Sequence, residues 1–266
     1  MGGSLGMAIK KHRLAREVIG LSHRQTALAQ AMKMKAIDVP CLDVKKAIIN
    51  ADLVILAAPV DSITKLFATI NPYLKRSCLV TDIGSAKVKI VESAEKVLTN
   101  PGFFVGSHPL AGSEKNGVAN ATEDLFEGSS CIMTPTKKTN QVAIQKIRLF
   151  WTKLGTEVKI LPPEEHDEIL AYVSHLPHLL AYGLMSSIPP KFLEYASRGL
   201  KDTSRIAASS PQMWSDICMA NSKNILHALD QNVEILANYR KAIINHDHKE
   251  LISYFTKSQE MQRKIT

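Results

Sequence analysis

The chain has 266 residues, of which 45% are hydrophobic and 22% are charged. This balance excludes a disordered or fibrous chain, and the length fits one large or two modest domains. The longest apolar run covers residues 53–60, far short of the roughly 20 residues that cross a bilayer, so we expect no membrane span.

Helical patterns alternate with short β-branched runs in the first 160 residues. Strands are predicted at residues 17–22, 53–57, 78–82, 103–106, 131–134 and 157–161, with helices between them, for example over 85–98 and 140–154. Apolar strands that alternate with helices are typical of a parallel sheet covered on both faces. We therefore predict a mostly parallel α/β domain over residues 1–161.

The pattern changes after Pro162 and Pro163, where strand signals cease and long helical periodicity begins. Apolar residues that recur every three to four positions predict one buried helix stripe, formed by Ile169, Val173, Leu176, Leu180 and Leu184. We therefore predict an all-helical domain over residues 162–266.

A glycine cluster, MGGSLG, opens the chain and is followed by a helical stretch and a strand that ends at Ser22. Dinucleotide-binding folds place a Gly-rich turn between their first strand and first helix, where the backbone approaches a pyrophosphate. A flexible start is the alternative, but the α/β pattern favours a Rossmann-like domain in which Gly2 and Ser4 bind the cofactor. The first strand and the first two glycines of the fingerprint would then precede Met1, so we expect an N-terminally truncated domain.

The end of the second strand of such a fold reports on coenzyme choice. NAD-preferring domains carry an Asp or Glu there, about 20 residues past the glycines, to bind the ribose 2′-hydroxyl. This chain has Ser22, His23 and Arg24 instead, which suits a 2′-phosphate, so NADP is favoured over NAD. An ordinary basic loop is the alternative. We also assign Ala58 and Pro59, directly after the strand at 53–57, to the cofactor site.

Two polar segments follow predicted strands, at the sheet edge where open α/β folds bind ligands. Residues 81–87 (TDIGSAK) join a strand to a helix, and Ser85 there could serve the site or only cap the helix. Residues 106–114 (GSHPLAGSE) leave the next strand, and His108 could accept a proton at neutral pH. A surface histidine is the simpler interpretation of His108 alone.

The helical domain carries its own polar segment, SHLPH at residues 174–178. Pro177 lacks an N–H and crowds the preceding turn, so the helix must bend there and present His175 and His178 beside the bend. These histidines lack further ligands at a suitable spacing, so we predict no metal site. Further along, Arg205 in GLKDTSRIA could bind a carboxylate through two hydrogen bonds.

The net charge and the cysteine spacing limit which partners and which cell compartment are expected. The 33 basic and 25 acidic residues give a net charge of +8, without a basic run longer than two residues. A solvated basic surface or attraction of an anionic small substrate explains this charge, and no nucleic-acid motif is present. The four cysteines are widely spaced and indicate reduced thiols in a cytoplasmic protein: Cys41, Cys78, Cys131 and Cys218.

Taken together, GSHPLAGSE, DIGSAK, SHLPH, GLKDTSRIA and SPQMW resemble the motifs of prephenate/arogenate dehydrogenases of tyrosine biosynthesis, in the same order and spacing. The resemblance covers essentially the whole chain. It implies oxidative decarboxylation of prephenate or arogenate to 4-hydroxyphenylpyruvate or tyrosine, with reduction of NAD(P)⁺. The opening departs from the GxGxxGGS turn of that family, in which Gly2 would be the third glycine.

The resemblance also implies roles for single residues. His108 would accept the proton of the ring hydroxyl as hydride leaves that carbon, and Ser85 would hydrogen-bond the same hydroxyl. Residues implied to bind the substrate or shape its pocket are His178, Arg205, His175, Ser113 and Glu114. Family members dimerise through the helical domain, so a homodimer is expected.

Two alternatives remain at this stage. One is another two-domain NAD(P) enzyme of the β-hydroxyacid or 6-phosphogluconate type, which would carry a catalytic lysine where this chain has SHLPH. The other is a non-catalytic member of the same fold, since the cofactor turn is incomplete. The sequence leaves open the choice between prephenate and arogenate and any feedback by tyrosine.

Overall fold

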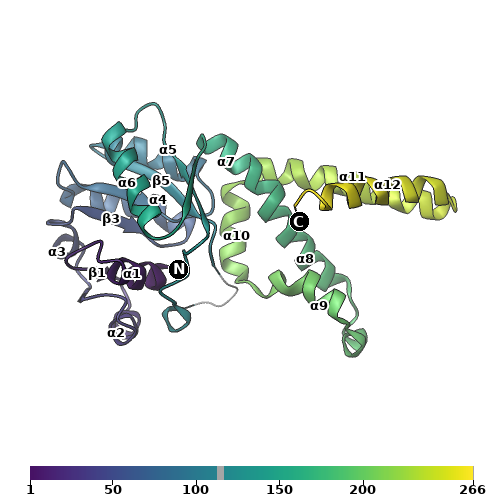
Figure 1. Ribbon diagram of the computed structural model, residues 1–266, viewed down its shortest axis with the longest axis horizontal. Helices are drawn as coiled ribbons and strands as arrows, with labels where there is room; N and C mark the ends of the chain where they lie inside the picture. The colour runs from purple at the N-terminus through teal and green to yellow at the C-terminus, as the bar shows by residue number, and fades with distance from the viewer. Residues whose placement is uncertain (113–116, 266) are drawn as a thin grey trace. The chain divides into compact units, whose positions relative to one another are not determined.

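The computed structural model describes residues 1–112 and 117–265, and within them seven strands form two sheets (Figure 1). A two-stranded parallel sheet pairs β1 (Ile19–Leu21) with β2 (Val39–Cys41). The larger sheet has the order β3-β4-β5-β6-β7, formed by Leu53–Leu56, Leu79–Asp82, Phe104–Pro109, Ser130–Thr134 and Glu157–Ile160. Its neighbours are parallel except β5 and β6, which are antiparallel. The predicted mostly parallel α/β fold is confirmed.

Helices cover both faces of the larger sheet. Phe104 enters one hydrophobic core and the next residue, Val105, enters the other, because successive side chains of a strand point to opposite faces. The helices that contribute to the first core are α3 (Val44–Ile48), α4 (Val60–Ile70) and α5 (Val88–Val97), and those of the second are α1 (Gly2–Lys11) and α6 (Gln141–Lys153). This arrangement places the carboxyl ends of β3 and β4 at one edge.

The predicted strands agree with the observed ones to within a few residues, but the sequence pattern missed β2. This strand contains Pro40, which has no N–H for a ladder hydrogen bond and so weakens any strand signal. In the two-stranded sheet Pro40 lies opposite Gly20, where one missing donor is tolerated. α2 (Gln25–Lys33) connects β1 to β2. The strand expected upstream of Met1 stays a prediction.

Helices and short connections follow the sheet after Pro162, and no strand lies among the described residues there. The first helical elements are α7 (Pro163–Leu170), the π-helical turn η4 (Ala171–His175), α8 (Leu176–Ser187), α9 (Arg198–Ser204) and α10 (Pro211–Ala220). α7 contacts α5 and β6, and α10 contacts α4. The distortion expected at Pro177 takes the form of η4, a wider turn directly before α8. Shorter 3-10 turns are η1 (Asn71–Tyr73), η2 (Pro101–Phe103), η3 (Val118–Asn120), η5 (Pro190–Tyr195) and η6 (Arg205–Ala208).

The predicted buried stripe along this helix is wrong. Val173 is 67% exposed and Ile169 and Leu180 are each 37% exposed, whereas Leu176 and Leu184 are half-buried. The π turn holds an extra residue and therefore rotates the faces of α7 and α8 relative to each other. The side that is buried instead carries Pro163, His166, Asp167, Leu170, Ala171, His175 and Ala181.

The chain divides into two compact units, Met1–Ser222 and Lys223–Thr266. The second consists of α12 (His248–Gln262) and nearly all of α11 (Ser222–Ile244), joined by a short turn in which the Asp247 carboxylate accepts a hydrogen bond from the Glu250 amide at 2.9 Å. Tyr239 packs its ring on Phe255 at 5.6 Å between centroids. The domain boundary predicted between residues 161 and 162 stays a prediction.

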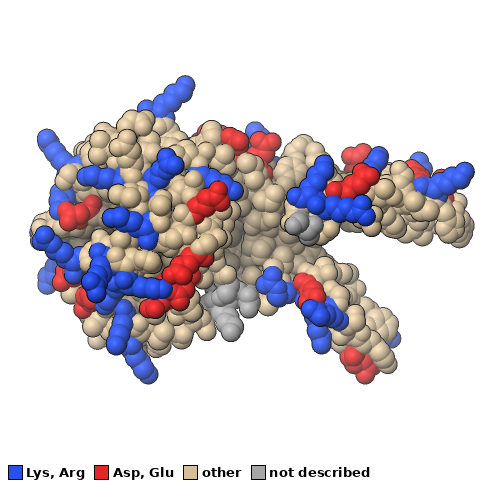
Figure 2. Space-filling view, viewed as in Figure 1, with Lys and Arg blue, Asp and Glu red and all other residues tan. Residues whose placement is uncertain are grey.

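Lys and Arg side chains are spread over the drawn face of the α/β part, with Asp and Glu side chains among them (Figure 2). Several lysines there pair with acids, such as Lys10 with Asp38 at 2.5 Å and Lys75 with Asp52 at 2.7 Å. Exposed pairs of this kind contribute little stability, and they fit a solvated surface better than a basic stripe. Among the described helices, none has the length and hydropathy of a transmembrane span.

Candidate active site

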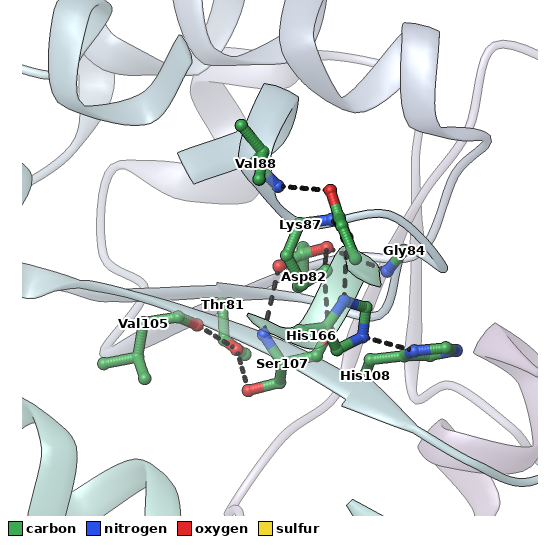
Figure 3. A network of polar contacts seen from close by, with 10 residues as sticks. Thr81, Asp82, Gly84, Lys87, Val88, Val105, Ser107, His108 and His166 are labelled. Carbon is green, nitrogen blue, oxygen red and sulfur yellow. Dashed lines mark hydrogen bonds and ion pairs between the residues drawn. The ribbon is translucent and has the colours of Figure 1, made fainter. Parts of the chain in front are cut away.

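The neighbouring parallel strands β4 and β5 deliver polar residues to the same sheet edge. β4 ends at Asp82, and β5, which is buried along its whole length, carries Ser107 and His108 near its end. Thr81 links the two strands, because its hydroxyl donates to the Val105 carbonyl at 2.7 Å and lies 2.9 Å from the Ser107 hydroxyl. The edge is therefore cross-linked by side chains as well as by the ladder (Figure 3).

A fully buried ion pair joins Lys87 to Asp82 beneath this edge, with both side chains 0% exposed. The Lys87 ammonium also donates to the Ser107 carbonyl at 2.8 Å. The Asp82 carboxylate accepts from the amides of Gly84 at 2.8 Å and Ser107 at 3.2 Å. Burying two charges is costly unless further hydrogen bonds compensate, and here the carboxylate has two amide donors and the ammonium has one carbonyl acceptor besides the ion pair itself. The turn after β4 is thereby tied to the backbone that carries His108.

His108 contacts a second buried histidine from the helical segment. Its Nδ1 lies 2.9 Å from Nε2 of His166 (Figure 3). Nδ1 of His166 in turn lies 2.8 Å from Oδ1 of Asp167. His108 is only 7% exposed, and His166 and Asp167 are buried. Three ionisable side chains therefore form one continuous line from α7 to the end of β5.

Asp167 also caps helix α5, which the sequence pattern assigned to Ser85 as an alternative. Its Oδ1 accepts from the Lys87 amide at 2.7 Å and its Oδ2 from the Val88 amide at 3.0 Å. The helix begins at Val88, so the interpretation of Ser85 as its cap is wrong. A carboxylate at this position satisfies free amides and complements the helix dipole. Ser85 lies half-buried in the turn between β4 and α5.

Burial sets the charge state of these histidines. Burial is the main cause that lowers the pKa of His108 well below its usual value, and neighbouring His166 and Lys87 lower it further. Burial also lowers the pKa of His166, against the opposing effect of Asp167. A group that loses its hydration on burial favours its neutral form. Both rings are therefore neutral at pH 7, and a neutral imidazole can accept a proton.

His175, at the end of the π turn, is buried beside the same network. The Asn221 side-chain amide donates to the Asp167 carbonyl at 2.6 Å and lies 3.2 Å from Nδ1 of His175. Burial lowers the pKa of His175 to about 4. Its Nε2 is buried and has no hydrogen-bond partner among the described residues. A buried polar atom of this kind is unusual and marks a position where a ligand atom could bind.

One turn later, His178 stacks on Trp214 with ring centroids 3.7 Å apart, and its Nδ1 donates to the Ser174 carbonyl at 2.9 Å. Trp214 belongs to the SPQMW motif on α10 and contacts His175 as well, at 5.9 Å. Burial lowers the pKa of His178, and the charge of Arg205 lowers it further. Arg205 is exposed at the start of η6. The structure thus brings His175, His178 and Arg205 into one neighbourhood.

The residues predicted for the cofactor gather at another place on the sheet. A Cβ atom added to Gly2 would lie 3.0 Å from the Ala57 side chain, so the start of α1 lies close to the end of β3, where Ala58 and Pro59 follow. The first turn of α1 has no acidic residue and no side-chain cap, which suits a pyrophosphate. Ser4 is buried, and its hydroxyl accepts from the Thr122 amide at 3.1 Å.

The predicted coenzyme-selecting residues follow β1. Ser22 accepts a hydrogen bond from the Arg24 amide at 3.2 Å, while His23 and Arg24 are exposed. An exposed cation at the end of this strand fits a phosphate on the ribose. Ser113 and Glu114 lie outside the described residues. Within residues 1–112 and 117–265, no three His, Cys, Asp or Glu side chains converge to hold a metal ion.

Sequence reasoning missed His166 and Asp167. A signal was present, because Pro163, His166, Asp167 and Leu170 have the spacing of one helix face, and two of these positions are polar. Polar residues on a core-facing stripe indicate a buried partner. The partner itself could not be read from the pattern, since His108 is 58 residues away.

Comparisons with known proteins agree on one family. The model of the nucleotide-binding domain of prephenate dehydrogenase matches residues 5–160, and the model of its dimerisation domain matches residues 162–257. Prephenate dehydrogenase of Bacillus subtilis is 33% identical over 98% of this chain and 72% of that protein. Cyclohexadienyl dehydrogenase of Zymomonas mobilis is 35% identical over 82% of this chain and 76% of that protein.

Solved structures with a similar fold indicate the same family. Prephenate dehydrogenase of Aquifex aeolicus, crystallised with hydroxyphenyl propionate and NAD⁺, has a TM-score of 0.91 at 30% identity and covers 99% of this chain and 94% of its own. Arogenate dehydrogenase of Synechocystis has a TM-score of 0.82 at 25% identity, over 99% of this chain and 96% of its own. The likeness to a 3-hydroxybutyryl-CoA dehydrogenase of Escherichia coli, with a TM-score of 0.52 at 16% identity, is one of fold alone.

The α/β domain with its helical partner, the motif residues gathered around His108 and the matches along the whole chain point the same way. The chain belongs to the prephenate/arogenate dehydrogenase family, NAD(P)-dependent oxidoreductases of tyrosine biosynthesis.

Proposed function

We propose that this chain oxidatively decarboxylates prephenate or arogenate at the sheet edge formed by β4 and β5, with His108 as the general base. The observation that supports this assignment most directly is the position and hydrogen bonding of His108. The ring is nearly buried at the end of β5, its Nδ1 contacts His166, and burial keeps its pKa well below the usual value. A neutral imidazole that is held in one orientation has a nitrogen lone pair with which it can accept the proton of a hydroxyl.

The reaction balances with one proton acceptor on the protein. His108 takes the proton of the ring hydroxyl while the hydride on the same carbon leaves. The bond from the ring to its carboxylate then breaks, CO₂ departs, and the electron pair of that bond completes the aromatic ring. The phenolate oxygen that this leaves takes the proton back from His108. When bound, the nicotinamide supplies the hydride acceptor. Loss of CO₂ and the gain of aromaticity make the step effectively irreversible.

Neighbouring residues bind and orient the substrate in this proposal. Ser85, in the turn held by the Lys87–Asp82 pair, hydrogen-bonds the reacting hydroxyl. Arg205 pairs with a substrate carboxylate, which suits an exposed guanidinium on a net-positive chain. His178, held flat against Trp214, and His175, whose Nε2 has no partner among the described residues, contact the bound substrate. Ser113 and Glu114 shape the pocket.

For the coenzyme, we propose that Gly2, Ser4, Ala58 and Pro59 surround the dinucleotide and that NADP is preferred to NAD. Support for the preference is the exposed Arg24 beside Ser22 and His23 at the end of β1, without an acidic residue in that turn. NAD⁺ is the dinucleotide in the Aquifex aeolicus crystal, so both coenzymes require testing. Arg24→Ala should raise the Michaelis constant for NADP⁺ about tenfold and leave that for NAD⁺ nearly unchanged.

We further propose that the chain acts as a homodimer through its helical domain, residues 162–266. The match of the dimerisation-domain model to residues 162–257 supports this, as do exposed apolar side chains such as Val173 on η4 and Phe255 on α12. Exposed apolar side chains are available for such an interface where they lie next to one another. A monomer in light scattering would contradict the proposal.

The test of the function is nicotinamide absorbance with the chain, prephenate or arogenate, and NAD⁺ or NADP⁺. Reduced coenzyme that forms only with substrate and chain together supports the proposed reaction, and omission of single components names substrate and coenzyme. Absence of reduction with every pair would favour a non-catalytic member of the family. The same assay with L-tyrosine added tests feedback.

A further inference from the structure

The His166–Asp167 pair has no role in the proposed reaction, yet it is among the most deeply buried polar groups described. Both side chains lie on the inner face of α7, at positions where the helix would otherwise carry apolar residues. Burying a carboxylate and an imidazole is unfavourable unless each gains strong partners. Those partners are His108 on one side and the start of α5 on the other.

We propose that His166 and Asp167 are positioning residues that fix His108 in the tautomer able to act as a base. This inference rests on the proposed function, in which His108 accepts the substrate proton. Neither residue touches the substrate in this proposal; both act through the ring of His108.

The hydrogen-bond directions follow from the chemistry of the three groups. The Asp167 carboxylate can only accept, and it already accepts two backbone amides, so Nδ1 of His166 must be the donor in their 2.8 Å contact. In a neutral imidazole the other nitrogen is then an acceptor, so Nε2 of His166 accepts from Nδ1–H of His108 at 2.9 Å. Nε2 of His108 consequently carries the lone pair. Without this line, either nitrogen of His108 could hold the proton.

Asp167 couples the ring to the rest of the site. The same carboxylate binds the amides of Lys87 and Val88, which directly follow the turn that contains Ser85. Its own carbonyl accepts from Asn221, which fixes the helix backbone at that point. One side chain therefore holds both the orientation of His108 and the start of α5.

The hydrogen-bonded residues Asp167, His166 and His108 also place a negative charge where proton transfer to His108 creates a positive one. Charged or titratable groups that face His108 are His166 and His175 from the helical segment and Lys87 from the turn after β4. Lys87 is positive and is matched by Asp82. The proton gained by His108 would therefore add a second positive charge. Among the described residues, Asp167 is the carboxylate that hydrogen bonds connect to His108, through His166. Such a fixed charge needs no reorganisation during the reaction.

The first experiment compares His166→Ala with Leu170→Ala. Leu170 is equally buried one turn further along α7 and has no part in the line. His166→Ala should lower kcat on the order of 10²-fold and leave KM within about twofold, because the base is misplaced while the substrate contacts persist. Leu170→Ala should keep kcat within about twofold. His166→Gln, whose amide oxygen can still accept from His108, should recover part of the loss.

A second measurement does not depend on activity. In protein labelled with ¹⁵N-histidine, the imidazole nitrogen shifts of His108 report its tautomer directly. We expect Nδ1 protonated in the wild-type chain and a mixture of tautomers in His166→Ala. A wild-type ring protonated on Nε2 would overturn the proposal even if the variants fail to fold, and so would an unchanged kcat in folded His166→Ala.

His108→Asn separates this proposal from the proposed function. If His108→Asn keeps wild-type turnover, His108 is not the base, and both its role in the proposed function and the positioning role of His166 and Asp167 are wrong. If His108→Asn is inactive while His166→Ala has wild-type turnover, the function stands and the positioning role is wrong.

Discussion

The edge formed by β4 and β5 and the segment around Arg205 belong to the same candidate site but are built differently. At the edge, His108, Lys87 and Asp82 are buried, and each has partners from distant parts of the chain. Arg205 is exposed on a short 3-10 turn. The edge is therefore pre-organised by buried contacts before substrate arrives, whereas the arginine side chain lies in solvent, where screening weakens its interactions. Changes at the edge should affect turnover and stability, and changes at Arg205 should affect substrate affinity.

The largest effect is expected at His108. His108→Asn keeps a similar size but removes the base, so turnover should fall on the order of 10²–10⁴-fold with KM little changed. Steady-state kinetics with saturating coenzyme measures this. His248→Asn, an exposed histidine at the start of α12, is the control and should keep wild-type turnover. Unchanged turnover in His108→Asn would remove the residue from its role.

Lys87→Met tests whether the buried pair holds the edge together. The substitution leaves the Asp82 carboxylate buried without its cation, which typically costs about 3–5 kcal/mol of unfolding free energy. Lys89→Met, two residues along, removes an exposed pair with Asp61 at 2.6 Å and should cost no more than about 1 kcal/mol. Urea unfolding of both variants measures the difference. Equal losses of unfolding free energy in the two variants would mean that the buried Lys87–Asp82 pair stabilises the fold no more than an exposed pair does.

Acid should destabilise the buried histidines. The pKa of His175 is about 4 in the folded chain, against about 6.5 in the unfolded chain. Between these two pH values the unfolded state binds a proton at His175 and the folded state does not, so acid favours unfolding. The contribution of neutral His175 to the free energy of unfolding is fully present above pH 6.5. It is lost as the pH falls toward 4, by about 3 kcal/mol in total. The lowered pKa values of His108 and His166 act in the same direction.

Urea unfolding at several pH values between 7.5 and 4 measures this slope. His175→Gln lacks the titrating ring and should show a flatter dependence than the wild-type chain. Identical slopes would show that His175 takes up its proton equally well in both states.

The smallest effect is expected at Arg205. Arg205→Ala should raise KM for the substrate on the order of tenfold with little change in kcat, because a carboxylate contact binds ground state and transition state alike. Arg198→Ala is the matched control, since Arg198 is exposed on the adjoining α9 and pairs with Asp202 at 3.5 Å. A fall in kcat without a change in KM would contradict the binding role and would blur the contrast between the two regions.

The sequence alone predicted the α/β fold, all five strands of the larger sheet and the position of His108 near a strand end. These features depend on side-chain period and on short motifs, which are local properties of the chain. The sequence did not predict strand β2, because Pro40 weakens its pattern. It did not predict the helix start at Val88, because the capping carboxylate of Asp167 is far away in the sequence.

The tertiary structure decided which polar groups meet and which apolar faces are covered. Asp167 reaches the Lys87 amide from 80 residues away, and no local pattern encodes such a pairing. The π turn at Ala171–His175 rotated the helix faces, so Val173 became exposed while His175 became buried. Both outcomes depend on how sheet and helices pack in three dimensions. The sequence by itself determined the elements and the residue types of the site, and only packing determined the line from Asp167 through His166 to His108.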